Sequence, residues 1–429
     1  MRSSSTVFAF ATLACTGIQH GYAQESAVQI YGTLNVDFEN VRTRNPSPAS
    51  TLLPGQLGAT PTGIRVGSRN RISQNSANIG FRGNENLGDG LNAFFQVESA
   101  VAVDVGGSFL ASRNSAVGMQ GDFGSFRIGQ WDTPYKTMSG AVDPMYFTGI
   151  AYTGAIIGTP GFGIGPVTAG ALATSADGRT YAAAANASFE RRQGNVVQYW
   201  TPSIYGLLFR FAYAANESKS SNAASVSHVD PTVLSMSAQY EYGPVFLGYA
   251  FERHRDLFGL SALAAAAQAP LVLATTGFAS ISAADRGGKL VVRYTLSDTQ
   301  FGLMWEELKY ERSVSTASIG AFNEYKRRAI VVTLLHKVGK GTIRSLYSKA
   351  GDGTCGRVGG STCDTAGLGA KQFSLGYSHT LSKRTDIYGF YTRVTNGARG
   401  SYQFANGAGL GAAPGSSSIG YVSGIRHTF

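Results

Sequence analysis

Alternation of apolar and polar residues is the feature of this sequence that most constrains its fold. Between Val28 and Glu39 every even-numbered residue is apolar or Gly, and most odd-numbered residues are polar. The same pattern returns in segments 207–213, 245–252, 290–296 and 419–429. Because successive side chains of a β-strand point to opposite faces, each segment predicts a strand with one apolar and one polar face.

The connections between these segments alternate in length. Short turns such as 86–90, 242–244 and 339–341 alternate with long loops rich in Gly, Ser and Ala, of which 132–194 is the longest. Short turns on one rim and long loops on the other are typical of an outer-membrane β-barrel. Strands are predicted near 27–41, 71–83, 91–103, 112–121, 125–132, 195–203, 206–216, 231–242, 244–254, 286–296, 299–311, 326–338, 341–350, 370–381, 384–395 and 418–429.

The predicted fold is therefore all-β, a 16-stranded antiparallel transmembrane β-barrel with short periplasmic turns and long extracellular loops. A closed barrel leaves no unpaired edge in the bilayer, and one of 16–18 strands encloses an aqueous channel. Only 14% of the residues are charged, and Gly and aromatic residues are abundant, which disfavours a disordered chain or a coiled coil. Aromatic girdles at the membrane interfaces are predicted to include Tyr199, Tyr213, Tyr249, Tyr294, Tyr388 and Phe429.

The N-terminus has the pattern of an export signal. Arg2 precedes an apolar run from Val7 to Ile18, and Gly21 and Ala23 occupy the small-residue positions of a cleavage site. The sequence therefore predicts a signal peptide at 1–23 and one mature domain at 24–429. A lipoprotein anchor at Cys15 is the alternative, but the aliphatic residue expected three positions earlier is absent.

After export only Cys355 and Cys363 remain, with no further ligands nearby to complete a zinc site. In an oxidising compartment two cysteines at this spacing favour a disulfide within one loop, with two free thiols as the alternative. No metal and no cofactor are expected.

Several segments resemble one bacterial family, the trimeric general porins of beta-proteobacteria. They are 28–34, 79–98, 121–125, 381–388 and the ending 424–429. The resemblance implies a homotrimer in the outer membrane and a third extracellular loop, about 132–194, that folds into the lumen as a constriction. It also implies that the terminal Phe429 is read by the barrel assembly machinery. Members of this family commonly carry Arg where this chain has Asn78 and Gln130.

The alternation assigns charged residues to the lumen, because an Arg on the lipid face near the bilayer midplane costs about 2–4 kcal/mol. Asp37 and Glu252 share this inward parity, and Arg393 is assigned to the lumen on a weaker pattern. A lumen that contains both positive and negative charges has a transverse electric field if Asp132 or Asp143 on the inserted loop lies opposite the basic residues of the wall. The predicted pore-lining and selectivity residues are Arg82, Arg127, Arg210, Arg293, Arg426, Glu98, Asp132 and Asp143.

The formal net charge is +10, and removal of Arg2 with the signal peptide leaves +9, which favours anions in a channel. Basic residues in outer loops could equally contact phosphates of lipopolysaccharide. Nucleic acid is not an expected partner, because Lys and Arg are dispersed and the chain is exported. The expected partners are copies of the same chain, outer-membrane lipid and lipopolysaccharide, the assembly machinery, and small hydrophilic solutes and ions.

Catalysis is not expected, since the sequence shows no Gly-x-Ser-x-Gly elbow, no His-Glu-x-x-His helix and no phosphate loop. Three functions remain open. The first is a water-filled diffusion channel, weakly anion-preferring. The second is a channel selective for small organic anions whose long third loop carries a binding site. The third is a non-conducting adhesin or structural barrel.

Overall fold

The computed structural model describes residues 28–429 except 54, 108–109, 162–186, 216–218, 220–229, 258, 261–281, 314–321, 362, 405–409 and 411–413, so the expected signal peptide lies outside the described residues. Its elements are β1 (Gln29–Arg44), β2 (Arg69–Gln74), β3 (Asn78–Gly88), β4 (Leu91–Ala100), β5 (Ser115–Gly121), β6 (Gly124–Asp132), α1 (Pro134–Gly140), η1 (Thr153–Ala155), β7 (Arg192–Trp200), β8 (Leu207–Ala214), β9 (Thr232–Tyr242), β10 (Val245–Arg255), β11 (Ser282–Leu296), β12 (Thr299–Ser313), β13 (Phe322–Val338), β14 (Gly341–Ala350), β15 (Thr354–Arg357), β16 (Ala370–Ser382), β17 (Thr385–Asn396) and β18 (Ser417–Thr428).

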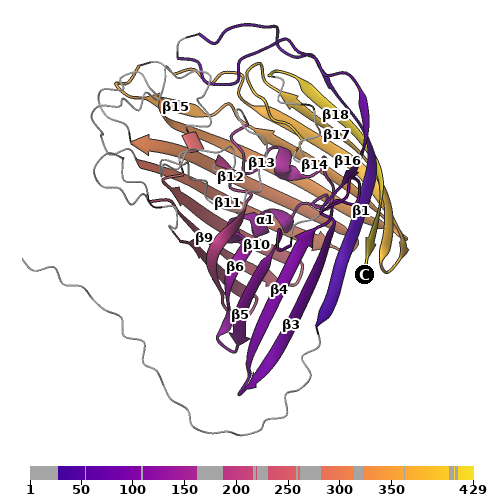
Figure 1. Cartoon of the computed structure of the whole chain (residues 1–429). Coiled ribbons are helices and arrows are strands. Elements are labelled where there is room, and N and C mark those ends of the chain that lie inside the picture. The colour runs from indigo at the N-terminus through magenta and orange to yellow at the C-terminus, as the bar shows by residue number, and fades with distance from the viewer. Residues whose placement is uncertain are drawn as a thin grey trace, which may run out of the picture.

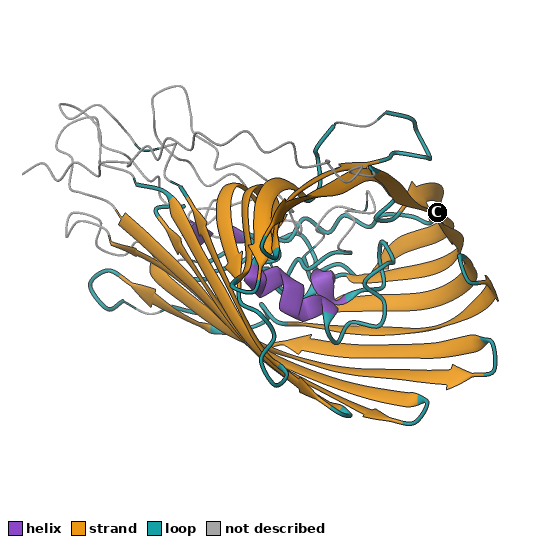
Figure 2. Cartoon of the chain, turned by 90° about the horizontal axis from the view of Figure 1, so that it is seen from below, coloured by secondary structure: helices purple, strands orange, loops and turns teal. Residues whose placement is uncertain are grey.

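The strands form one closed antiparallel barrel (Figures 1 and 2). Strands β2 and β3 both pair with β1, so they are two halves of one wall strand interrupted at 75–77. The short β15 lies in a loop and pairs with β13 beside the end of β14. Of the eighteen strand segments, one is thus outside the wall and two form a single wall strand, which leaves the predicted sixteen. The barrel closes where β1 pairs with β18.

The two faces of the wall follow the alternation in the sequence. In β1, Leu34 and Phe38 are exposed on the outer face, whereas Asn35, Asp37 and Glu39 are buried on the inner face. The outer face of the wall is thus apolar and exposed, and the inner face is polar, as the alternation predicts. Among the described residues no helix is long and apolar enough to cross a membrane.

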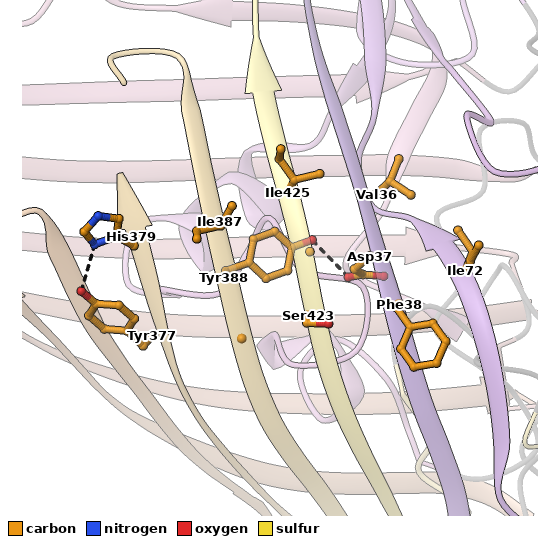
Figure 3. Close-up of a pocket in the computed structure, with 12 residues that line it drawn as sticks. Val36, Asp37, Phe38, Ile72, Tyr377, His379, Ile387, Tyr388, Ser423 and Ile425 are labelled. Carbon is orange, nitrogen blue, oxygen red and sulfur yellow. Dashed lines mark hydrogen bonds between the residues drawn. The ribbon is translucent and has the colours of Figure 1, made fainter. Parts of the chain in front are cut away.

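The closing seam corrects one expectation about the aromatic girdles (Figure 3). Tyr388 points into the barrel, where its hydroxyl donates to Asn35 Oδ1 at 2.7 Å and to Asp37 Oδ2 at 3.1 Å. Its parity opposes that of Ile387, which points outward with Ile425 and Val36. Tyr213, Tyr249, Tyr294 and Phe429 are exposed, as girdle residues should be. Tyr388 is therefore a lumen residue, and its assignment to the aromatic girdle was wrong. Its position near a strand end does not decide which face of the wall it occupies.

The outer loops are joined to one another. Cys355 and Cys363 form the predicted disulfide. The buried Arg399 donates to the carbonyls of Leu57, Asp364 and Ala366, and so connects the loops after β1, β14 and β17. These contacts hold the three loops against one another at the end of the barrel that carries the long loops.

Candidate channel constriction

The third long connection turns into the barrel directly after β6. Thr133 caps helix α1, its hydroxyl accepting from the backbone N–H of Lys136 at 3.3 Å, and Pro134 occupies the first helical position. Figure 2 shows this helix inside the barrel, and the N–H of Tyr135 donates to Ser235 Oγ on the wall at 3.1 Å. The loop runs from 133 to 191, since Asp132 ends β6 and Arg192 begins β7. Its part at 162–186 lies outside the described residues.

A buried carboxylate on the wall holds the loop. Glu306 of β12 accepts from the N–H of Gly158 at 3.0 Å and from the hydroxyl of Tyr135 at 2.8 Å. Arg327 of β13 pairs with Glu306 at 3.0 Å and donates to the carbonyls of Ile156 and Thr159. The loop is thus attached to the wall through backbone groups of 156–159 and through the hydroxyl of Tyr135.

A second ion pair attaches the returning end of the loop. Glu190 pairs with Lys289 of β11 and accepts from Ser139 Oγ at 2.5 Å. Burial raises the pKa of Glu190 above its ordinary value, and the Lys289 ammonium opposes that shift. Burial also lowers the pKa of the neighbouring Arg191 to about 10. Both ends of the described loop are therefore fixed to β11–β13.

Two lumen cavities, of about 510 and 240 Å³, lie beside the loop. Asn75, Ser76, Arg113 and Tyr146 line both of them. These residues come from the break between β2 and β3, the segment before β5, and the inserted loop. They mark the narrow point between the two cavities, which is the candidate constriction.

Three wall arginines surround the larger cavity and reach the loop. Arg293 donates to the carbonyl of Ala141 at 3.1 Å, and Arg344 donates to the carbonyl of Pro144 at 2.8 Å. The guanidinium of Arg426 stacks on the ring of Phe147 at 4.6 Å, on which Arg344 also lies at 5.2 Å. With Arg113, four guanidinium groups line this cavity.

Most of these charges have acidic partners. Arg426 pairs with Asp386 at 2.6 Å, Arg293 pairs with Glu241, and Arg113 pairs with Glu98. Arg344 differs, because it donates to the hydroxyl of Ser378 at 3.2 Å and to the loop carbonyl of Pro144, both of which are uncharged. Of the four arginines, it is the one without an ion pair to a carboxylate among the described residues.

The acidic side of the constriction is weaker than expected. Asp143 accepts from the N–H groups of Met145 and Thr153 and from the hydroxyl of Thr153, all within 2.8 Å. Burial raises its pKa to about 6, although these hydrogen bonds favour the ionised form. Asp132 pairs with Lys136 at 2.8 Å and with Arg192 at 3.1 Å. Neither carboxylate presents an uncompensated negative charge to the arginines.

The family model described as Gram-negative porin matches residues 5–399, most of the chain. The chain belongs to the Gram-negative porin family. It is an outer-membrane protein, and its barrel is the fold of that family.

Individual relatives of this porin differ in how much they share. Outer membrane porin protein 32 of Delftia acidovorans is 26% identical over 82% of this chain and 85% of the relative. Major outer membrane protein P.IA of Neisseria meningitidis serogroup C is 36% identical over 27% of this chain, and the match spans 30% of that relative's length. The solved anion-selective porin from Comamonas acidovorans has a TM-score of 0.67 at 22% identity, covering 94% of this chain and all of the other. That structural likeness shows the shared fold.

The structure separates the lumen residues predicted for this porin into groups. Arg293, Arg426 and Asp143 line the larger cavity, and Asp132 lines the smaller one. Glu98 pairs with Arg113, which lines both cavities. The other three arginines point inward away from these cavities. Arg82 lies towards the periplasmic end, bonded to Gln29 at 2.9 Å, and Arg127 and Arg210 stack on Trp200 at 3.8 and 4.8 Å.

Three further charged residues were assigned to the lumen from the alternation, and the structure confirms two of them. Asp37 and Glu252 are buried inward as expected, Glu252 beside His254 at 2.8 Å. Arg393 is exposed and shares the outward parity of Ile387 and Gly389, so its assignment to the lumen was wrong.

Sequence reasoning missed Arg113, Arg344, Lys136 and Arg192. Arg344 had a detectable signal, because it alternates with the outward Ile343, Ser345 and Tyr347. Arg113 falls within the strand predicted at 112–121, but β5 begins only at Ser115, so strand parity does not apply to it. Gln130 donates to the carbonyls of Ala111 and Arg113, both at 3.1 Å. The amide thus supports the segment that carries the arginine of the constriction.

Proposed function

We propose that this porin forms a water-filled channel for passive diffusion of ions and small hydrophilic solutes, with a weak preference for anions. The observation that carries the proposal is the charge arrangement at the constriction. Four arginines line the larger cavity, and the one carboxylate that lines it, Asp143, is bonded to backbone N–H groups. A cationic constriction raises the local concentration of anions.

A channel selective for small organic anions is the second candidate. The loop, α1 and inward aromatic side chains such as Tyr135, Phe189 and Tyr310 fill part of the lumen, so the route past Arg113 is narrow. A narrow passage lined by guanidinium groups suits carboxylates, which accept two parallel hydrogen bonds from one Arg. Current block that saturates at micromolar carboxylate would favour this candidate. Absence of conductance from folded protein would favour the adhesin or structural barrel.

The assembly of the porin is part of the proposal. Three copies form a homotrimer, residues 1–23 are removed during export, and Phe429 is the signal read by the barrel assembly machinery. The barrel is embedded in outer-membrane lipid and lipopolysaccharide. No catalytic activity is proposed, because relatives are named as porins and the lumen charges are engaged in ion pairs and loop contacts.

Single-channel recording of the purified protein in a potassium chloride gradient tests the selectivity. We expect a reversal potential displaced towards the chloride potential and conductance steps in groups of three. A unit charge about 6 Å from a passing ion contributes about 0.7 kcal/mol in water, or about a three-fold change in local ion concentration. The Arg344→Gln variant should therefore lower the anion-to-cation permeability ratio about two- to three-fold.

Arg82→Gln is the matched control, since it removes the same charge from the lumen wall outside both cavities. It should change the permeability ratio much less than Arg344→Gln. A wild-type reversal towards the potassium potential, or equal effects of the two variants, would contradict the proposed role of the constriction.

A further inference from the structure

Basic residues gather on the outer surface of the barrel, at the end of the wall that carries the long loops. They share the outward parity of the lipid-facing apolar residues on their strands, and all lie on β10–β14, β16 and β17. Together they are called the outer basic face. Its members are Arg253, Arg255, Arg286, Lys309, Lys326, Arg328, Lys349, Lys371 and Arg393.

Strand register sets these charges directly beside one another. Arg253 is paired with Arg286, Arg286 with Lys309, and Lys309 with Lys326, so four basic residues form one row across β10–β13. Lys349 of β14 is directly opposite Lys371 of β16. Like charges directly opposite each other destabilise a sheet. Such rows are stable only where other negative charge approaches them.

The acidic residues on this face compensate part of the charge. Glu311 pairs with Lys309 at 2.7 Å, Glu307 pairs with Arg328 at 2.7 Å, and Glu324 pairs with Lys309 at 3.1 Å. Asp230 and Asp256 also lie 3.5 and 3.8 Å from Arg255, so five acidic residues stand against the nine basic side chains of the outer basic face. Lys349 and Lys371 are exposed, and neither has an acidic partner among the described residues. The surplus is greatest on β14, β16 and β17.

The position of the face relative to the membrane narrows the choice of ligand. On the periplasmic side of it, the outer surface is apolar and aromatic, with Trp305, Tyr347 and Phe373 all exposed. Lys349 is paired with Ile330, two residues nearer the periplasmic end than Arg328. Lys371 is level with Lys349, and Arg393, paired with Phe373, is two residues nearer the periplasmic end again. The basic residues of β13–β17 therefore stay close together at the loop end of the wall.

The outer surface of β2–β9 lacks this feature, whereas β1 carries Arg42 and Arg44 with outward parity near its loop end. Every Lys or Arg within the strand bounds of β2–β9 has inward parity: Arg69, Arg71, Arg82, Arg127, Arg192 and Arg210. The two sides of the barrel thus present different surfaces at the same height. A general need for surface charge would not produce that difference.

We propose that the outer basic face binds the phosphate groups of lipopolysaccharide in the outer leaflet. This rests on the outer-membrane location of the porin and is independent of its ion selectivity. The phosphates meet the Lys and Arg side chains through charge-assisted hydrogen bonds, while the acyl chains pack on the apolar belt beneath. The site lies on the strands themselves, whereas the sequence suggested lipopolysaccharide contacts in the outer loops.

The test measures binding of purified bisphosphorylated lipid A to refolded full-length mature protein in detergent. The test variant is Lys349→Gln/Lys371→Gln/Arg393→Gln, which keeps long polar side chains at exposed positions. We expect at least about ten-fold weaker binding, because each basic residue near an anionic lipid surface contributes about a factor of five. Enzymatic removal of the lipid phosphates should weaken wild-type binding to a similar degree.

The control variant is Lys340→Gln/Lys383→Gln/Arg384→Gln, which removes equal charge from exposed periplasmic turns. It should bind lipid A within about two-fold of wild type. Equal losses in both variants, unchanged binding in the test variant, or equal competition by phosphatidylglycerol would overturn the site. Lys349→Gln/Lys371→Gln serves if the triple variant does not refold. Reversal potentials of both variants should equal that of wild type, which separates this result from the proposed channel function.

Discussion

At the scale of single residues, Asp143 shows how an acidic side chain of the lumen can serve the loop instead of the channel. Its two carboxylate oxygens accept three hydrogen bonds within the inserted loop, and the side chain is 7% exposed. Burial raises its pKa to about 6, against about 3.9 for an unperturbed Asp. The carboxyl therefore couples the order of the loop to pH.

The sign of this coupling follows from proton binding. Between pH 4 and 6 the docked loop binds a proton that the undocked loop has released, so its stability falls as pH rises through this range and is level above it. The Asp143→Asn variant should show a flatter profile, because the amide does not titrate. Hydrogen exchange of peptides covering 143–157, corrected for intrinsic rates, measures the difference. Asp298→Asn in a periplasmic turn is the control, and parallel profiles of wild type and Asp143→Asn would contradict the prediction.

The sequence predicts which lumen residues face inward, but it does not predict which partners they have. Strand parity correctly places Arg293 and Arg426 on the inner face, because every side chain of a regular strand obeys the same alternation. Parity carries no information about pairing, so it could not separate Arg344 from arginines with carboxylate partners. The role of Asp143 depends on backbone N–H groups of an irregular loop, which no residue pattern specifies.

At the scale of elements, the regular wall was predictable and its exceptions were not. The break between β2 and β3 contributes Asn75 and Ser76 to the constriction, yet the alternation suggested one continuous strand there. The short β15 pairs with β13 beside the disulfide and was read as loop. Both segments depart from a regular strand where their side chains contact a loop instead of lipid. The alternation of apolar and polar residues is therefore lost there.

The attachment of the inserted loop to β11–β13 predicts a contrast between neighbouring residues of β12. Glu306→Gln leaves Lys289 and Arg327 with surplus charge in a buried site, which should destabilise the protein by about 3–5 kcal/mol. Glu307→Gln, one residue later and facing outward, should cost less than about 1 kcal/mol. Chemical unfolding in detergent measures both.

Open-channel noise gives a second readout of the same contrast. A loosened loop should increase current fluctuations in Glu306→Gln and leave Glu307→Gln like wild type. Equal unfolding free energies and equal noise in the two variants would show that the buried carboxylate does not hold the loop.

At the scale of the whole molecule, the barrel depends on one seam between its first and last strands. Phe429 closes this seam through its backbone, exchanging hydrogen bonds with Gly32 at 3.2 and 3.0 Å. Its ring lies over Gly32, where an added Cβ would come within 2.5 Å of the ring and 2.6 Å of the Asn78 carbonyl. The terminal residue thus has a structural place in addition to its proposed role as an assembly signal.

Two substitutions separate these roles. Gly32→Val obstructs the seam sterically, so it should reduce folding several-fold both in detergent and in cells. Phe429→Ala keeps the backbone pairing and removes only the ring; if the assembly machinery reads that ring, barrels should refold in detergent as wild type but accumulate several-fold less in the outer membrane. Heat-modifiable electrophoretic mobility measures folded barrel in both settings. Equal loss of Phe429→Ala in detergent and in cells would mean that the ring acts through packing at the seam, whereas wild-type levels in both would remove the assembly role.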